Sequence, residues 1–185
     1  MTQYLAANRR TIDPLEHASD IVPKIGKDLL LTTKANERVN TMTIGWGALG
    51  AVWGRPAFTA YIRTGRFTHE LLDVNDEFTI NVPDAQTARA ILGTAGSTSG
   101  RTMDKIAELG LTLVEPEVVS VPGIKELPLT LECRTIYRQD QVQAAIAEPY
   151  RTQFYPQDVD SSSCGANRDS HTMFIGEIVA AYVIE

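Results

Sequence analysis

Acidic residues are missing from two stretches of a chain that is otherwise acidic. The 185 residues include 23 Asp and Glu against 17 Lys and Arg, a formal charge of −6 at pH 7. Yet no Asp or Glu occurs between Glu37 and Glu70, or between Asp84 and Asp104. Without carboxylates, both stretches lack the groups that would repel an anion. The net negative charge argues against nucleic acid and against anionic membranes as partners.

Cysteine is scarce, and a long hydrophobic run is absent. Cys133 and Cys164 have neither metal-ligand spacing nor the pattern of a disulfide framework, so we expect two unpaired thiols. No apolar segment is long enough for a signal peptide or a membrane span, which predicts a cytoplasmic protein without membrane association. The three histidines form no cluster with ligand spacing, so no metal site is expected.

The composition is that of one globular domain. Hydrophobic residues make up 43% of the chain and charged residues 22%. We expect a single domain over residues 1–185, with residues 1–27 as an N-terminal extension. Residues 148–169 are rich in Pro, Gln, Asp and Ser, which predicts a mobile loop that can act as a lid.

Alternating polar and apolar residues predict mainly β-structure. Glu77 to Val82 alternates strictly and ends at Pro83, and further strands are expected at 28–34, 41–46, 57–63, 130–137 and 173–184. Short helices are expected from Thr68, as N-cap, to Val74, and at 85–92 and 101–109. Six or more strands with few helices and no strand-helix alternation favour an antiparallel barrel with short peripheral helices.

The strand at 40–46 has two different faces. Asn40, Met42, Ile44 and Trp46 alternate with Thr41, Thr43 and Gly45. Small hydroxyl residues and a glycine on one face leave room for a flat ligand, although the same pattern also suits an ordinary barrel strand.

Arginines gather where the next strand ends. Arg63 and Arg66 flank a strand-to-helix turn, and Thr68 stands where a helix is expected to begin. Unpaired N–H groups at a helix start, together with guanidinium groups, can hold phosphate. A solvated basic turn is the alternative interpretation.

A second candidate anion site is the Gly- and Ser-rich stretch from Gly93 to Thr102. It lacks the Lys of a Walker loop and does not join a strand to a helix as a dinucleotide fingerprint does. Ser99, Gly100 and Arg101 could wrap anionic oxygens, or the stretch could be a flexible surface loop. His171, directly before the last strand, is a structural histidine or a ligand contact. No serine lies in a nucleophile elbow, so a Ser-His-Asp triad is not supported.

Taken in order, these motifs resemble those of the flavin-reductase-like FMN-binding split-barrel family. Within this family, the chain is most similar to the flavoredoxin-like branch. The stretches that carry the resemblance are Asn40-Thr-Met-Thr-Ile-Gly-Trp-Gly47, Trp53-Gly-Arg-Pro56, Arg63-Thr-Gly-Arg-Phe-Thr68, Glu77-Phe-Thr-Ile-Asn-Val-Pro83, Ser99-Gly-Arg-Thr-Met-Asp-Lys105 and His171-Thr-Met-Phe-Ile-Gly-Glu-Ile178. They run from about Leu29 to the C-terminus. Thr64-Gly65 departs from the Pro-Ser that many relatives carry before the second arginine.

The resemblance implies a six-stranded antiparallel split β-barrel, a homodimer, and non-covalent FMN near the subunit interface. By the family pattern, Asn40 to Trp46 would contact the isoalloxazine and ribityl chain. His171 would lie near the ring or the substrate entrance, which Phe154 and Tyr155 would cover. The phosphate would be surrounded by Arg63, Arg66, Thr68, Ser99, Gly100, Arg101 and Lys105.

Three functional hypotheses follow from the resemblance. The first is an oxidoreductase that passes electrons from NADH or NADPH through FMN to free flavin, a ferric chelate or a protein acceptor. The second is an FMN-binding electron carrier that does not itself oxidise NAD(P)H. The third is a split barrel that binds haem or a deazaflavin, because a fold alone does not define a ligand. No general acid or base is assigned in any of them.

Overall fold

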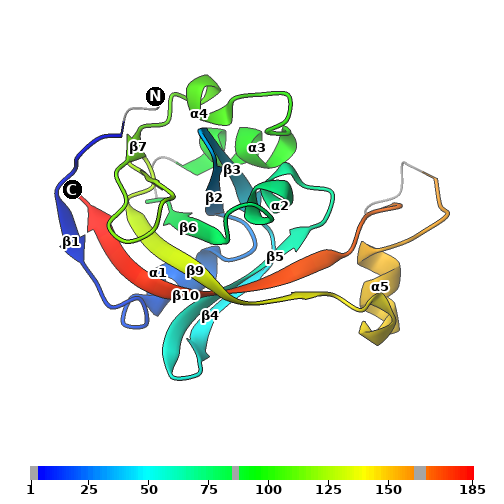
Figure 1. The fold of residues 1–185 in the computed structure, drawn as a ribbon. Coiled ribbons are helices and arrows are strands. Elements are labelled where there is room, and N and C mark those ends of the chain that lie inside the picture. The colour runs from blue at the N-terminus through cyan, green and yellow to red at the C-terminus, as the bar shows by residue number, and fades with distance from the viewer. Residues whose placement is uncertain (1–3, 85–87, 161–165) are drawn as a thin grey trace.

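The computed structural model describes residues 4–84, 88–160 and 166–185 (Figure 1). None of the helices within these residues is long and apolar enough to cross a membrane. In chain order, the elements are β1 (Arg9–Thr11), α1 (Ala18–Ile21), η1 (Val22–Lys24), β2 (Leu29–Ala35), β3 (Arg38–Ile44), β4 (Gly47–Val52), β5 (Arg55–Arg63), α2 (Phe67–Leu72), β6 (Glu77–Val82), α3 (Ala88–Ser97), α4 (Lys105–Glu108), β7 (Leu113–Val114), β8 (Gly123–Ile124), β9 (Leu129–Asp140), η2 (Gln143–Ala145), α5 (Glu148–Phe154) and β10 (His171–Ile184).

One antiparallel sheet forms the body of the protein. Its strand order is β3-β2-β6-β9-β10-β5-β4, and β1 pairs with the C-terminal end of β10. Because β3 and β4 follow each other in the chain but lie at opposite ends of this order, the sheet must curve back on itself. The long β9–β10 ribbon continues beyond the barrel and carries α5 (Figure 1).

The predicted fold class, a mainly β antiparallel split barrel with short helices, is confirmed. All six predicted strands are present. The sheet contains two more, β4 and β1. The sequence of β4 is Gly-Ala-Leu-Gly-Ala-Val, whose small residues give no polar-apolar alternation, so its pattern did not reveal a strand.

The predicted start of α2 was wrong. The helix begins at Phe67 with Arg66 at the N-cap, and no side chain caps it. Thr68, predicted as the cap, is 1% exposed and its hydroxyl accepts a hydrogen bond from the amide of Asn40 instead. The Thr68 side chain, predicted from the local sequence to cap the helix, therefore forms a tertiary contact with β3.

The next two helices also differ from the prediction. α3 continues through Gly93–Ser97, which was predicted to be a loop, and residues 85–87 of the predicted helix lie outside the described residues. A side chain at Gly96 would place its Cβ 2.4 Å from Thr43 Oγ1, so glycine lets α3 approach β3 closely. α4 begins at Lys105 instead of Arg101, because the Asp104 carboxylate caps it by accepting two backbone N–H bonds.

The predicted N-terminal extension and the predicted mobile loop both contain regular structure. Within residues 1–27, β1 is a full member of the main sheet. Within residues 148–169, Glu148–Phe154 form α5, and residues 161–165, which include Cys164, lie outside the described residues. Cys133 is fully buried in the barrel, and burial together with the Glu132 charge raises the pKa of its thiol.

The two larger apolar clusters lie on opposite sides of β2. The larger fills the barrel and includes Phe58, Phe78, Leu131 and Phe174. The smaller, around Leu30, Leu92 and Ile124, packs α3 and residues 111–127 onto the outer face of β2. β2 is therefore covered on both sides, which explains the continuous apolar and threonine run of its sequence.

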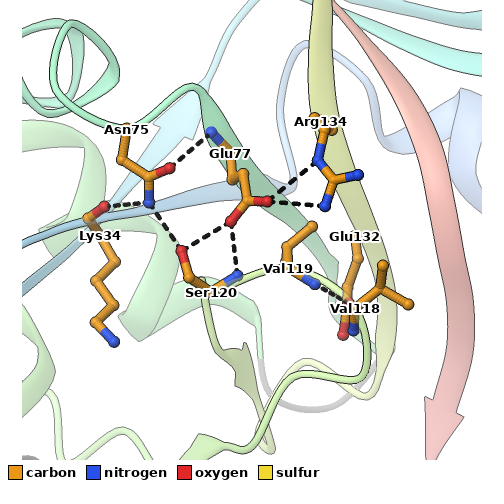
Figure 2. Close-up of polar contacts among 8 residues, drawn as sticks. All are labelled: Lys34, Asn75, Glu77, Val118, Val119, Ser120, Glu132 and Arg134. Carbon is orange, nitrogen blue, oxygen red and sulfur yellow. Dashed lines mark hydrogen bonds and ion pairs between the residues drawn. The ribbon is translucent and has the colours of Figure 1, made fainter.

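The loop before β8 is fixed by two carboxylates from the sheet. Glu132, on β9, is completely buried and accepts the backbone N–H groups of residues 117, 118 and 119. The Tyr182 hydroxyl donates a further bond to it, and burial followed by the Glu132 charge raises the Tyr182 pKa. Figure 2 shows the Glu132 carboxylate beneath the Val118–Val119 backbone.

The second carboxylate is Glu77 at the start of β6. It accepts bonds from the Ser120 backbone and hydroxyl and pairs with Arg134 (Figure 2). Burial alone would raise the pKa of Glu77, but these bonds outweigh burial and lower it. A lowered folded-state pKa means that this stabilisation is present at neutral pH and is lost as the pH falls through that value.

We predict that Glu132→Gln lowers the free energy of unfolding by about 2–3 kcal/mol, because an amide N–H₂ would face backbone N–H donors that have no other partner among the described residues. Urea unfolding followed by circular dichroism measures this. Glu115→Gln, which removes the same charge at an exposed position, should change stability little. Equal stability of the two variants would contradict the assignment.

Candidate functional site

Two adjoining cavities open beside β3. The first, here called the anion pocket, measures about 190 Å³ and lies between β3, α2 and the segment from α3 to α4. Its lining residues are Asn40, Met42, Thr43, Gly65, Arg66, Phe67, Thr68, Ala95, Gly96, Thr98, Ser99, Gly100, Arg101 and Lys105.

The second cavity, here called the aromatic cleft, measures about 240 Å³. It shares Met42, Thr43 and Arg66 with the anion pocket, so the two form one elongated site. Its lining residues are Met42, Thr43, Gly45, Trp46, Tyr61, Arg63, Arg66 and His171.

The structure brings most of the predicted site residues to these two cavities. Tyr61 was missed, although its position two residues before Arg63 on β5 placed it on the same face. Phe67, Ala95 and Gly96 were missed because only the docking of α2 and α3 onto β3 brings them there.

Phe154 and Tyr155, predicted at the substrate entrance, line neither cavity. Among the predicted cofactor-binding residues, Thr41 lines neither cavity. Its hydroxyl bonds to Thr32 Oγ1 on the neighbouring strand, 3.1 Å away, in a buried polar row that continues to Asn81. The backbone carbonyl of Thr41 is nonetheless important, because it accepts a bond from Lys105. The predicted division of β3 into a ligand face and a core face was therefore too simple.

Lys105 is a buried cation at the floor of the anion pocket. It is 4% exposed, and its Nζ donates to the carbonyls of Thr41 at 3.0 Å and Ala95 at 2.7 Å. Burial, and then the positive charge of Arg66, lower the pKa of Lys105 to about 8. An ammonium group has three N–H donors, so one donor remains beyond the two carbonyl bonds.

Arg66 stands where the two cavities meet. It is exposed, and among the described residues its guanidinium has neither a hydrogen bond nor an ion pair. Its charge lowers the pKa values of both Lys105 and His171, so it lies near each of them. This guanidinium is therefore available to a ligand that spans both cavities.

The wall of the anion pocket opposite Lys105 is made by a contact between β3 and α2. Asn40 Nδ2 donates to Thr68 Oγ1 at 2.9 Å, which leaves the Thr68 hydroxyl proton without an acceptor among the described residues. Gly100 passes so close that a Cβ there would lie 2.0 Å from Asn40 Oδ1. Only glycine fits at this position, and its absence of a side chain keeps the pocket open.

Arg101 is held by other protein groups at the rim. It forms an ion pair with Glu70, and its guanidinium also donates to the carbonyl of Gly65 at 3.1 Å. The first carboxylate-free stretch ends at Glu70, and the fold places that carboxylate beside Arg101 at the edge of the pocket. Arg101 therefore contributes less free positive charge than Arg66.

A larger cavity, about 700 Å³, lies beyond the Phe67 and Gly100 wall. Its lining includes the acidic residues Glu37, Glu70 and Asp104 and a single arginine, Arg38. This charge balance is unfavourable for an anion, so size alone does not identify the site.

Aromatic rings form the far end of the aromatic cleft. The ring of Trp46 lies 4.5 Å from His171 and 5.1 Å from Phe154, centroid to centroid. Tyr155, 5% exposed, contacts the same cluster through its hydroxyl, which lies 2.6 Å from His171 Nδ1. Phe154 and Tyr155 thus pack against the aromatic rings of the cleft without lining it themselves.

His171 is neutral at physiological pH. Burial, and then the charges of Arg63 and Arg66, lower the pKa of His171 to about 3. The ring can therefore accept or donate one hydrogen bond at each nitrogen, but it adds no charge to the cleft.

Arg63 connects the barrel to the segment between α5 and β10. Its guanidinium donates to the carbonyls of Phe154, at 3.2 Å, and Asp169, at 2.5 Å. Burial lowers the pKa of Arg63. Arg63 was predicted among the phosphate-binding residues, but it lines the aromatic cleft and not the anion pocket.

Chemically, the site joins a small, positively charged pocket to a flat, aromatic cleft. Buried donors and free cations at one end suit a dianion, and ring faces at the other suit a planar heterocycle. No group of three or more His, Cys, Asp or Glu side chains within the described ranges could hold a metal ion.

The sequence model of the flavin reductase like domain matches residues 29–185, so the chain belongs to this family. Among curated proteins, an uncharacterized protein of Archaeoglobus fulgidus is 35% identical over 100 residues, which cover 54% of this chain and 55% of that protein. An uncharacterized protein of Pyrococcus abyssi is 30% identical over 115 residues, which cover 62% and 49%. The chain thus spans about half the length of the curated relatives it matches.

Solved structures share the fold. The FMN-binding domain of a flavin reductases-like enzyme from Shewanella baltica has a TM-score of 0.64 at 18% identity, covering 97% of this chain and 79% of that one. Flavoredoxin from Methanosarcina acetivorans has a TM-score of 0.61 at 23% identity, covering 84% and 67%. At identities below 25%, these likenesses establish the common split-barrel fold.

Proposed function

We propose that the elongated site binds FMN and that the protein is a flavin-reductase-like oxidoreductase. The observation that carries the proposal is the junction of the two cavities at Arg66, which gives one continuous site with a cationic end and an aromatic end. FMN has the matching shape, with a phosphate dianion at one end of a ribityl chain and a planar ring at the other.

The residues of the anion pocket fit the phosphate of FMN. Lys105, Arg66 and the unused hydroxyl proton of Thr68 are donors toward this pocket. Charge-assisted bonds of this kind are about twice as strong as neutral ones. The nearby charges on Arg66 and Lys105 repel each other, and a bound dianion would remove that cost.

The aromatic cleft fits the ring of FMN. Trp46 and His171 offer ring faces, and Gly45 exposes backbone beside them. FMN, when bound, supplies the hydride and electron chemistry, while the protein supplies binding, orientation and the positive charge of Arg63 and Arg66. Neutral His171 orients the ring without giving up a proton.

Electrons would come from NADH or NADPH and pass to free flavin, a ferric chelate or a protein acceptor. The family, and the likeness to a flavin reductases-like enzyme from Shewanella baltica, support this direction. The likeness to flavoredoxin supports an electron carrier without NAD(P)H oxidation as the second candidate. A homodimer, as the sequence resemblance implies, and the cytoplasmic location expected from the sequence complete the proposal.

We predict that Arg66→Ala raises the Kd for FMN about ten- to a hundredfold, because it removes a charge-assisted contact with the phosphate. Quenching of FMN fluorescence measures the Kd. Arg55→Ala removes the same charge at the other end of β5 and should leave the Kd unchanged. If the wild-type protein does not bind FMN, the proposed function fails.

We predict that FMN affinity falls as the pH rises through about 8, because Lys105 then loses the proton and charge that attract the phosphate. Lys105→Met should show weaker binding at pH 7 and no such step between pH 7 and 9.5. Riboflavin, which lacks the phosphate, serves as the control ligand. A wild-type profile that stays flat over this range would remove Lys105 from the phosphate site.

We predict that the FMN-loaded protein oxidises NADH or NADPH in the presence of excess free flavin. The decrease in absorbance at 340 nm measures this oxidation. Negligible turnover, combined with rapid flavin reduction by a partner protein, would favour the electron carrier. The absorbance spectrum of the cofactor released on denaturation separates FMN from haem and deazaflavin.

A further inference from the structure

A hydrogen-bond chain, buried at the contact between His69 and Thr172, fastens α2 to the β9–β10 ribbon. His69 Nε2 lies 2.9 Å from Thr172 Oγ1 on β10, and that hydroxyl donates to Asp140 Oδ1 on β9 at 2.5 Å. On the other side of the ring, His69 Nδ1 lies 3.2 Å from the Asp73 carboxylate. We call these four residues the His69 clamp.

The hydrogen-bond roles follow from the number of protons. Thr172 has a single hydroxyl proton, and Asp140 takes it. Thr172 Oγ1 can then only accept from His69, which places a proton on Nε2. The bond is buried, since His69 is 7% exposed and Thr172 is fully buried. A buried contact of this kind fixes the distance between two elements more firmly than a surface pair.

The clamp acts on the element that carries two donors of the anion pocket. α2 has only six residues, with Arg66 at its N-cap and Thr68 directly before His69. Such a short helix cannot hold its own position, so its contacts with the sheet determine where Arg66 and Thr68 point. The clamp and the Asn40 bond to Thr68 are hydrogen bonds from successive residues of α2 to different strands.

The same clamp reaches the strand that carries the aromatic cleft. Thr172 follows His171 directly on β10, and neighbouring strand residues point to opposite faces. His171 therefore faces the aromatic cleft while Thr172 faces α2. One buried contact thus sets the spacing between the cationic end and the aromatic end of the site.

We propose that His69 is a positioning residue for the phosphate of the bound flavin, acting through Thr172 to hold Arg66 and Thr68 in place. This inference rests on the proposed function of the same site. His69 lines neither cavity, so it is a positioning residue and not a catalytic residue.

The test compares FMN with riboflavin, which has the same ring but no phosphate. Thr172→Val removes the hydroxyl and keeps the branched shape. It should raise the Kd for FMN about tenfold, through loss of a buried hydrogen bond, and leave the Kd for riboflavin within about twofold. Thr172→Ser restores the hydroxyl and should restore FMN affinity. Circular dichroism checks that each variant is folded.

A second variant keeps the test decisive if Thr172→Val does not fold. His69→Phe keeps a planar ring without donors and should show the same selective loss of FMN affinity. The matched control is His17→Phe, because His17 pairs with Asp20 at 3.0 Å on α1, away from both cavities. It should leave both dissociation constants unchanged.

The outcomes separate the inference from the function on which it rests. If the clamp variants weaken FMN and riboflavin equally, or weaken neither, the positioning role is wrong while flavin binding stands. If the wild-type protein binds neither flavin, the proposed function fails first.

Discussion

The ammonium group of Lys105, buried against two backbone carbonyls, is the interaction on which the site depends. It bonds to Thr41 on β3 and to Ala95 on α3, and so holds the α3–α4 segment against the barrel. Thr43 and Arg38 of β3 also donate hydrogen bonds to the carbonyls of Leu92 and Gly100 in this segment, but without Lys105 the anion pocket would lose its floor. The group is costly to bury, as its lowered pKa shows, and such a cost is common where a protein prepares a site for an anion.

The site brings the positive charges of Arg63, Arg66 and Lys105 close together, at mutual cost. Arg66 lowers the pKa values of Lys105 and His171, and Arg63 adds to the effect on His171. Arg101, by contrast, is neutralised by Glu70 at the rim. The free charges therefore lie at the junction of the two cavities, where a bound dianion would relieve their repulsion. The larger cavity nearby, with three carboxylates, offers no such relief.

Much of the fold could be predicted from local patterns. Glu77 to Val82 alternates strictly and became β6, and the β-branched run at the C-terminus became the long central strand β10. The pattern failed where side chains are small, as in β4, and where tertiary contacts overrode local preferences. The Thr68 hydroxyl accepts a hydrogen bond from Asn40 and does not cap the helix. Gly96, predicted in a loop, lies in α3, where the lack of a side chain lets this helix approach β3.

The sequence by itself determined the kinds of groups at the site: arginines and hydroxyls placed in stretches without carboxylates, and glycines where backbone must pass closely. Only the tertiary structure decided which of them act together. Arg63 lines the aromatic cleft, and the Thr41 side chain belongs to a buried polar row. Glu70 forms an ion pair with Arg101. The physical reason is that a side chain's direction depends on strand register and on helix docking, and both are set by contacts between residues far apart in the chain.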